Sequence, residues 1–145
     1  MSLGKEDMMA VVAYRKEKTY TTLKEAEDMN DMEHWNLAVQ RLYYACFYMA
    51  SALLLSYGFG ARTHNGVMGQ LGQEFVSKGL LTKEEGRLYS RLLQNRITGD
   101  YNDFFDFVSE DVLPLLEPTR CLFLRHEYKR HIFRIDASLD RERAY

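Results

Sequence analysis

Apolar residues recur at helical spacing between Trp35 and Leu53, and this stripe is the strongest constraint on how the chain folds. Positions three and four residues apart share one side of a helix, so the stripe predicts a helix with a wide buried face. Nowhere does the chain show the alternating pattern that a half-buried strand requires. The stripe consists of Trp35, Ala38, Val39, Leu42, Ala45, Cys46, Met49, Ala52 and Leu53. We therefore expect an all-α fold.

The remainder of the chain has the pattern of further helices joined by mostly short connections. We expect helices over residues 5–29, 30–57, 67–78, 82–98 and 109–135, of which the third is short. Ser109 is a preferred N-cap residue, whereas Pro118 should kink or restart the last helix because proline lacks a backbone donor. The sum is an up-and-down bundle of four main helices plus one short helix.

Two sequence pairs have the spacing of a capping box, in which a polar residue and an acid three positions later satisfy free backbone N–H groups. Asn30 with Glu33 is expected to begin the second helix, and Thr82 with Glu85 to begin the fourth. Gly99 is expected to end the fourth helix, since glycine tolerates the left-handed conformation of a C-terminal cap.

With 145 residues, 46% of them hydrophobic and 28% charged, the chain is long enough for one packed domain. We expect its core to span residues 5–135, with 136–145 as a frayed tail. Cys46 and Cys121 sit among apolar neighbours and are expected to be buried, reduced thiols. The N-terminus lacks a signal-peptide pattern, and the apolar run 42–55 is too short to span a membrane, so a cytoplasmic location is expected.

The formal net charge of -2 argues against a uniformly basic surface, but charge is segregated along the chain. Residues 100–119 contain six acids and no lysine or arginine, whereas residues 120–134 contain five basic residues and one acid. The basic stretch is interpreted either as a helix that contacts RNA, DNA or an acidic partner, or as a solvated helix face.

Arg96 extends the apolar stripe of its helix, where an unpaired charge is costly. It is either a phosphate-binding or catalytic arginine in a cleft, or one half of a structural ion pair with Asp100 or Asp103. Arg41 and Tyr44 lie three residues apart beside the long apolar face. They form either the wall of a groove in which tyrosine stacks on a base, or part of the core or of a dimer interface.

His64 lies in a polar connection, between Thr63 and Asn65. It either binds an anion or acts as an acid or base, or it has a structural role in which it caps the next helix or bonds a backbone carbonyl; we favour the structural role. The sequence contains no paired-cysteine spacing, no His-Glu-x-x-His and no glycine-rich phosphate loop. We therefore expect no metal and no cofactor.

Four motifs follow one another in a specific order on the expected helices. They are the run from Ala38 to Tyr48 that contains Arg-Leu-Tyr-Tyr-Ala, then Thr63–Gly66, Gly79–Leu81 and the Arg-Ile-Thr-Gly-Asp-Tyr run of 96–101. This series resembles the HEPN domain, most closely its stand-alone bacterial and archaeal branch, over roughly Lys18 to Glu117. The resemblance implies an up-and-down helical bundle that dimerises and works beside a minimal nucleotidyltransferase, often as a toxin–antitoxin pair.

Many HEPN domains are metal-independent ribonucleases whose motif is an arginine, a polar residue, a few further residues and a histidine. Here apolar Ile97 follows Arg96, and the positions where that histidine would stand are Asp100, Tyr101 and Asn102. An exposed aspartate, with a pKa near 4, is a poor proton donor at neutral pH. The family motif is therefore degenerate in this chain.

Three functional hypotheses remain. The first, which we favour, is a module that binds a nucleotide, RNA or a partner nucleotidyltransferase through Arg41, Tyr44, His64 and Arg96. The second is an endoribonuclease toxin that uses Arg96 with Asp100, Tyr101 or His64. The third is a purely structural oligomerisation protein.

Overall fold

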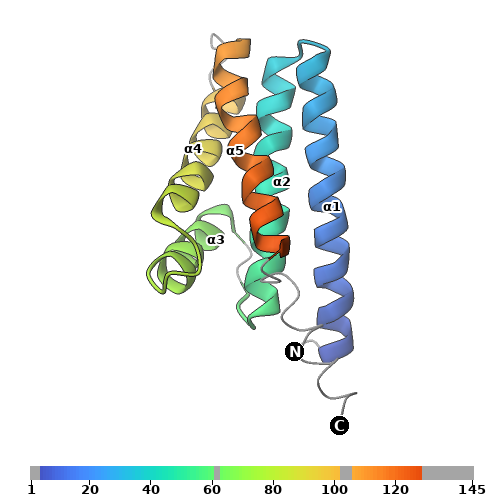
Figure 1. The fold of residues 1–145 in the computed structure, drawn as a ribbon, viewed down its shortest axis with the longest axis vertical. Coiled ribbons are helices and arrows are strands. Elements are labelled where there is room, and N and C mark those ends of the chain that lie inside the picture. Colours follow the sequence, from blue (N-terminus) through green and yellow to red (C-terminus); the bar gives the residue numbers. More distant parts are fainter. Residues whose placement is uncertain (1–3, 61–62, 102–105, 129–145) are drawn as a thin grey trace.

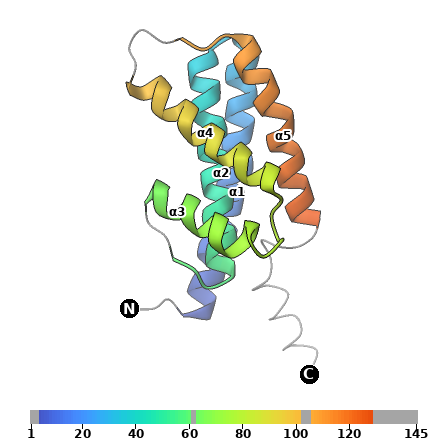
Figure 2. The ribbon, with the colours of Figure 1, turned by 90° about the vertical axis from the view of Figure 1, so that its left-hand side faces the viewer.

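A computed structural model describes residues 4–60, 63–101 and 106–128 of the chain. In chain order its elements are α1 (Lys5–Asp31), α2 (Trp35–Ser56), α3 (His64–Gln70), the π-helical segment η1 (Leu71–Val76), α4 (Lys83–Tyr101) and α5 (Ser109–Tyr128). No strand occurs in these ranges. The four long helices run alternately up and down, and α3 lies below α4, beside the lower part of α2 (Figures 1 and 2). The predicted all-α fold is confirmed.

Helix α2 forms the centre of the bundle. Of its 22 residues, 13 are buried, including every member of the predicted stripe except the half-buried Trp35. Helix α1 lies antiparallel along it, and α4 crosses it obliquely on another side (Figures 1 and 2). Several of the buried positions of α2 are alanine or serine, whose small side chains allow neighbouring helices to approach closely.

The predicted capping box at Asn30 and Glu33 is wrong, because α1 continues through both Asn30 and Asp31. The backbone N–H of His34 donates to the Met29 carbonyl at 2.8 Å, and that of Glu33 donates to the Asn30 carbonyl at 3.1 Å. These two bonds are the pattern of a Schellman cap, which ends a helix with one left-handed residue. Glu33, with φ of 63°, occupies that position in place of the usual glycine. Asn30 and Glu33 therefore belong to the C-terminal cap of α1 and do not begin α2.

The predicted capping box at Thr82 and Glu85 is confirmed. The Glu85 carboxylate accepts from the Thr82 backbone N–H at 2.9 Å, and the Thr82 hydroxyl accepts from the Glu85 N–H at 3.0 Å. Helix α5, by contrast, is capped by Asp111, whose carboxylate accepts from the Val108 N–H at 2.9 Å. Ser109 is thus the first residue of α5 and not its cap.

Gly99 does not end α4 and Pro118 does not restart α5, whereas the kink expected at Pro118 stays a prediction. Helix α4 runs through Gly99. The glycine serves packing and not a turn, because a Cβ at this position would lie 2.9 Å from the Phe107 ring. Helix α5 is continuous through Pro114 and Pro118, which both face solvent, where carbonyls that lose a backbone donor can bond to water. The predicted end of this helix near residue 135 and the tail after it lie outside the described residues.

The two cysteines differ in environment. Cys46 is fully buried, as predicted, and burial raises the pKa of its thiol to about 12. Cys121 lies on the exposed side of α5, so its predicted burial is wrong. No helix within the described ranges is long and apolar enough to cross a membrane.

The left-handed backbone of Glu33 yields a stability prediction. A non-glycine residue pays about 1 kcal/mol or more in this conformation, which glycine adopts freely. Glu33→Gly should therefore raise the free energy of unfolding by up to about 1 kcal/mol in urea denaturation. The matched control is Glu17→Gly in the exposed middle of α1, which should lower it by about 0.5–1 kcal/mol. Equal destabilisation by both substitutions would contradict the Schellman assignment.

Candidate functional site

The half-buried guanidinium of Arg96 on α4 lies against two tyrosines of α2. Its Nη2 donates to the Tyr44 hydroxyl at 3.1 Å. Its Cζ lies 5.6 Å from the ring centroid of Tyr43 and 5.3 Å from that of Tyr44. A cation at this distance from aromatic rings is attracted by their π-electrons, the more strongly when partly shielded from water. The phenols therefore hold a positive charge at the edge of the core.

His64 joins this cluster from a third helix. It is the first residue of α3, and its Nδ1 shares a short hydrogen bond with the Tyr43 hydroxyl. Its ring centroid lies 4.7 Å from that of Phe47, one turn further along α2. The prediction that His64 caps the next helix is wrong, since the Thr63 hydroxyl does so by accepting from the Gly66 N–H at 2.9 Å.

The surroundings fix the protonation of His64 and Tyr43 at neutral pH. Burial lowers the pKa of His64, and the positive charge of Arg96 lowers it further. Burial raises the pKa of Tyr43. The imidazole is therefore neutral and the phenol keeps its proton. The direction of their hydrogen bond depends on the imidazole tautomer: Nδ1 accepts from the phenol when the ring proton is on Nε2, and it donates to the phenol oxygen when the ring proton is on Nδ1.

Arg41 of α2 also lies close to the Tyr44 ring. Its Cζ lies 5.3 Å from the Tyr44 ring centroid, the same distance as that of Arg96. Its Nη1 also lies 3.6 Å from a carboxylate oxygen of Glu25 on α1. The structure thus brings together four of the predicted site residues, Arg41, Tyr44, His64 and Arg96, although Arg41 shares its charge with an acid.

The other two predicted site residues, Asp100 and Tyr101, belong to the last turn of α4. Their side chains lie outside the described part of the structure, as does Asp103. The predicted ion pair between Arg96 and one of these aspartates, and a catalytic role for Asp100 or Tyr101, therefore stay predictions.

In the basic C-terminal stretch, both arginines whose side chains are described form ion pairs. Arg120 Nε lies 2.7 Å from Glu27, and its Nη1 lies 3.0 Å from Glu117. Arg125 pairs with Glu85. These contacts tie α5 to α1 and α4, so for these two residues a structural role accounts for the positive charge. Residues 129–134 of the predicted basic helix lie outside the described ranges.

Sequence reasoning missed Tyr43 and Phe47, which link His64 to α2. Tyr43 is completely buried and contacts both His64 and Arg96. In the sequence it is one of two adjacent tyrosines, and nothing in the pattern distinguishes it from Tyr44. The spacing of four residues between Tyr43 and Phe47 places both on one side of α2 and was the available signal. Among the described residues, no group of three or more histidine, cysteine, aspartate and glutamate side chains is placed to hold a metal ion.

Comparison with known proteins supplies a family. The model of the HEPN domain matches residues 12–124. A UPF0332 protein of Thermotoga maritima is 37% identical over 102 residues, which cover 70% of this chain and 77% of that protein. A Methanocaldococcus jannaschii protein named "Putative toxin MJ0142" is 29% identical over 117 residues, covering 81% of this chain and 72% of that protein. A second protein of that archaeon, "Putative toxin MJ0605", is 30% identical over 97 residues, which cover 67% of this chain and 69% of that protein.

The contact between Arg96 and His64 predicts how the imidazole titrates. In wild-type protein the NMR titration of the His64 ring should give a pKa below 6.5. Arg96→Gln removes the neighbouring positive charge and should raise that pKa, although burial keeps it below 6.5. Arg91→Gln, an exposed arginine on the same helix, should leave it unchanged. An identical titration curve in all three proteins would show that His64 does not feel the charge of Arg96.

Proposed function

The chain belongs to the HEPN domain family, and we propose that it is an RNA-binding module whose phosphate site is formed by Arg96 and His64. The observation that carries this proposal is the convergence of both side chains on one pair of tyrosines of α2. They come from α4 and α3, which are separate in sequence, so the bundle brings two phosphate-recognising groups to one place.

Each group contributes a donor suited to an anion. A guanidinium matches the geometry of phosphate oxygens with its fork of N–H groups. The neutral imidazole, with Nδ1 engaged by the Tyr43 hydroxyl, presents its Nε2–H as a second donor. Because the Tyr43 and Phe47 rings hold the imidazole in place, a phosphate meets donors that are already oriented.

Tyr44 adds a surface for a nucleobase or ribose. It is half-buried, and the guanidinium groups of Arg41 and Arg96 both lie close to its ring. Aromatic rings flanked by arginine are a common means of binding single-stranded RNA, since every base has a face that can stack. The cluster therefore combines charge with stacking, the two elements that single-strand recognition needs.

The biological setting that we propose follows from the family and its relatives. Two relatives carry the name "Putative toxin", which supports a place for this chain in a toxin–antitoxin pair. A homodimer and a minimal nucleotidyltransferase partner in the cytoplasm complete the proposal, and these rest on the family resemblance. RNA is the ligand that the geometry of the site favours over a partner protein.

The neutral state of His64 favours one second candidate, metal-independent RNA cleavage. A neutral imidazole beside a phosphate-binding arginine is a suitable base for the ribose 2′-hydroxyl. That role needs the other tautomer, with Nδ1–H donating to the Tyr43 oxygen and Nε2 open to accept the proton. Arg96 would then stabilise the charge that builds up on the phosphate oxygens.

Arg96→Gln tests the binding function. Loss of a charge-assisted hydrogen bond, about 1.5–3 kcal/mol, should weaken binding of a fluorescent single-stranded RNA 12-mer roughly ten- to a hundredfold in anisotropy titrations at fixed salt. Arg91→Gln is the matched control and should bind like wild type. If the wild-type chain binds no RNA at micromolar concentration, the proposed function is incorrect.

Cleavage is tested separately. Total RNA incubated with the protein in EDTA should be cut by wild type and spared by both His64→Ala and Arg96→Ala if the cluster is catalytic. A Tyr43→Phe variant should retain part of the activity, because it loses only the hydrogen bond that orients the imidazole. RNA that stays intact with wild-type protein, while still being bound, assigns the chain to binding alone.

A further inference from the structure

A small cavity adjoins Arg96 on the side of the N-terminal turns of α2. Its volume is about 100 Å³, and it is lined by residues of α2 and α4 together with Phe107, which precedes α5. Asn36 and Gln40, on its wall, lie one to two helical turns before Tyr44. Arg96 therefore contacts Tyr43 and Tyr44 and also lines this cavity. A ligand bound by its guanidinium can extend into the cavity.

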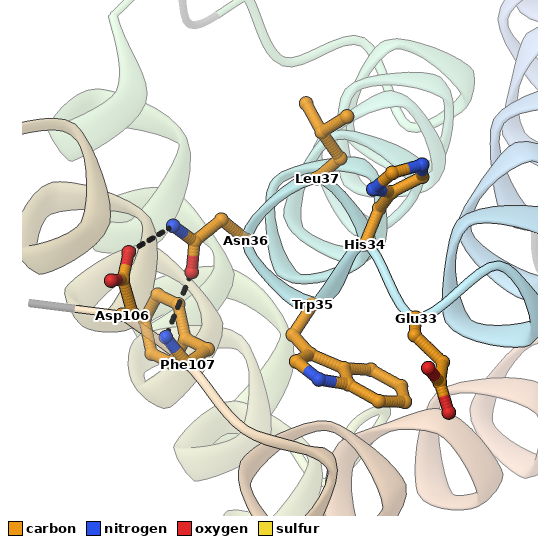
Figure 3. Close-up of a pocket in the computed structure, with 7 residues that line it drawn as sticks. All are labelled: Glu33, His34, Trp35, Asn36, Leu37, Asp106 and Phe107. Carbon is orange, nitrogen blue, oxygen red and sulfur yellow. Dashed lines mark hydrogen bonds between the residues drawn. The ribbon is translucent and has the colours of Figure 1, made fainter.

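The frame of the cavity is fixed by packing and hydrogen bonds. The Asn36 carboxamide accepts from the Phe107 backbone N–H at 2.8 Å and donates to Asp106 Oδ1 at 3.1 Å (Figure 3). Phe107 is 5% exposed and its ring fills the space in which a Cβ of residue 99 would stand. Gly99 thus lets the Phe107 segment close against α4. The cavity is therefore preformed, and its walls need little ordering when a ligand binds.

Two further carboxamides on the cavity wall are available to a ligand. Gln40 of α2 and Asn95 of α4 are half-buried, and within the described residues neither side chain makes a hydrogen bond. Each carboxamide offers a donor and an acceptor side by side, the pattern with which glutamine and asparagine pair with base edges. Apolar Leu37 and Val39 complete the lining and provide contact for the face of a ring.

The charge and size of the cavity limit what it can hold. Among the described residues no carboxylate lines it, and Arg96 is the charged side chain in that lining. The next cavity along α2, at Trp35, has a volume of about 290 Å³ and is bordered by Glu33 and Asp106, which would repel a phosphate (Figure 3). Pockets for drug-sized ligands have volumes of roughly 300–1,000 Å³, so a cavity of about 100 Å³ accepts a fragment such as one ring and not a whole nucleotide.

We propose that this cavity is a base subsite, which receives a single pyrimidine of RNA whose phosphate is bound by Arg96, and that Gln40 and Asn95 hydrogen-bond the base edge. The inference rests on the proposed RNA-binding function and adds a substrate preference to it. A single ring matches the small volume better than the fused rings of a purine do.

The test compares the affinities of eight-nucleotide U, C and A homopolymers at one salt concentration. Wild type should bind the U and C oligomers about tenfold more tightly than the A oligomer, the size of effect that good amide–base pairs give. The double variant Gln40→Leu with Asn95→Leu should reduce this preference to less than twofold. Gln94→Leu removes an exposed carboxamide next to Asn95 that does not line the cavity, and should keep the full preference.

The outcomes separate the two proposals. If wild type binds all three oligomers within twofold of one another, and Arg96→Gln weakens all of them, the base subsite is wrong and the phosphate site stands. A preference that survives the double substitution also overturns the subsite. If no oligomer binds, the proposed RNA-binding function fails and the subsite with it. Should the double variant not fold by circular dichroism, Asn95→Asp replaces it, because this near-isosteric change removes the amide donors and should likewise lower the preference.

Discussion

Burial of α2 is the constraint on which the rest of this structure depends. A helix enclosed by neighbours along most of its length must satisfy every polar group that it carries into the interior, since an unpaired buried hydroxyl is costly. The hydroxyl of the fully buried Tyr43 meets this requirement at His64, which fixes the first residue of α3 against α2. The hydroxyl of Tyr44 meets it at Arg96, which fixes α4 in the same way. The candidate site is therefore also the polar junction of three helices.

This double role changes how the site relates to the ribonuclease motif of the family. In that motif the histidine follows the arginine on the same helix, so the spacing of the two is set by local sequence. Here the imidazole comes from α3 and its orientation is set by a buried phenol. With the Tyr43 hydroxyl as donor, the imidazole faces a ligand as a neutral hydrogen-bond donor, which stabilises a bound phosphate without taking a proton from it. The tautomer with its ring proton on Nε2 therefore suits the proposed binding function, and the tautomer with its ring proton on Nδ1 suits cleavage.

Features governed by local chemistry were predictable from the sequence, and features governed by packing were not. The apolar stripe of α2 and the capping box of Thr82 and Glu85 involve residues close in sequence, and both are confirmed. The role of Glu33 was misinterpreted because the left-handed position of a Schellman cap is normally occupied by glycine, and a glutamate there gives no signal in the sequence. Gly99 was misinterpreted for the opposite reason, since its small size serves contact with Phe107 and not a turn.

The candidate site shows the same difference between features set by local sequence and features set by packing. Arg41, Tyr44, His64 and Arg96 were each recognisable as residues with binding chemistry, but their meeting depends on how α3 and α4 pack against α2. No spacing in the sequence encodes the contact between His64 and Tyr43, which are 21 residues apart and belong to different helices. Only the three-dimensional arrangement shows that Arg96 and His64 lie against the same two tyrosines.

Local fields, and not the net charge of -2, decide whether this chain suits an RNA ligand. Arg120 and Arg125 are offset by glutamates, so their contribution to a long-range positive field is small. Arg96 lies against the phenols of α2 and beside the carboxamides of the small cavity, where, in the proposed function, the lower dielectric strengthens its attraction for a phosphate. A site of this kind makes few phosphate contacts and releases few counterions, so salt-dependent attraction supplies little of its affinity. Selectivity must then come from stacking and from amide contacts to the base, the interactions that the walls beside Arg96 provide.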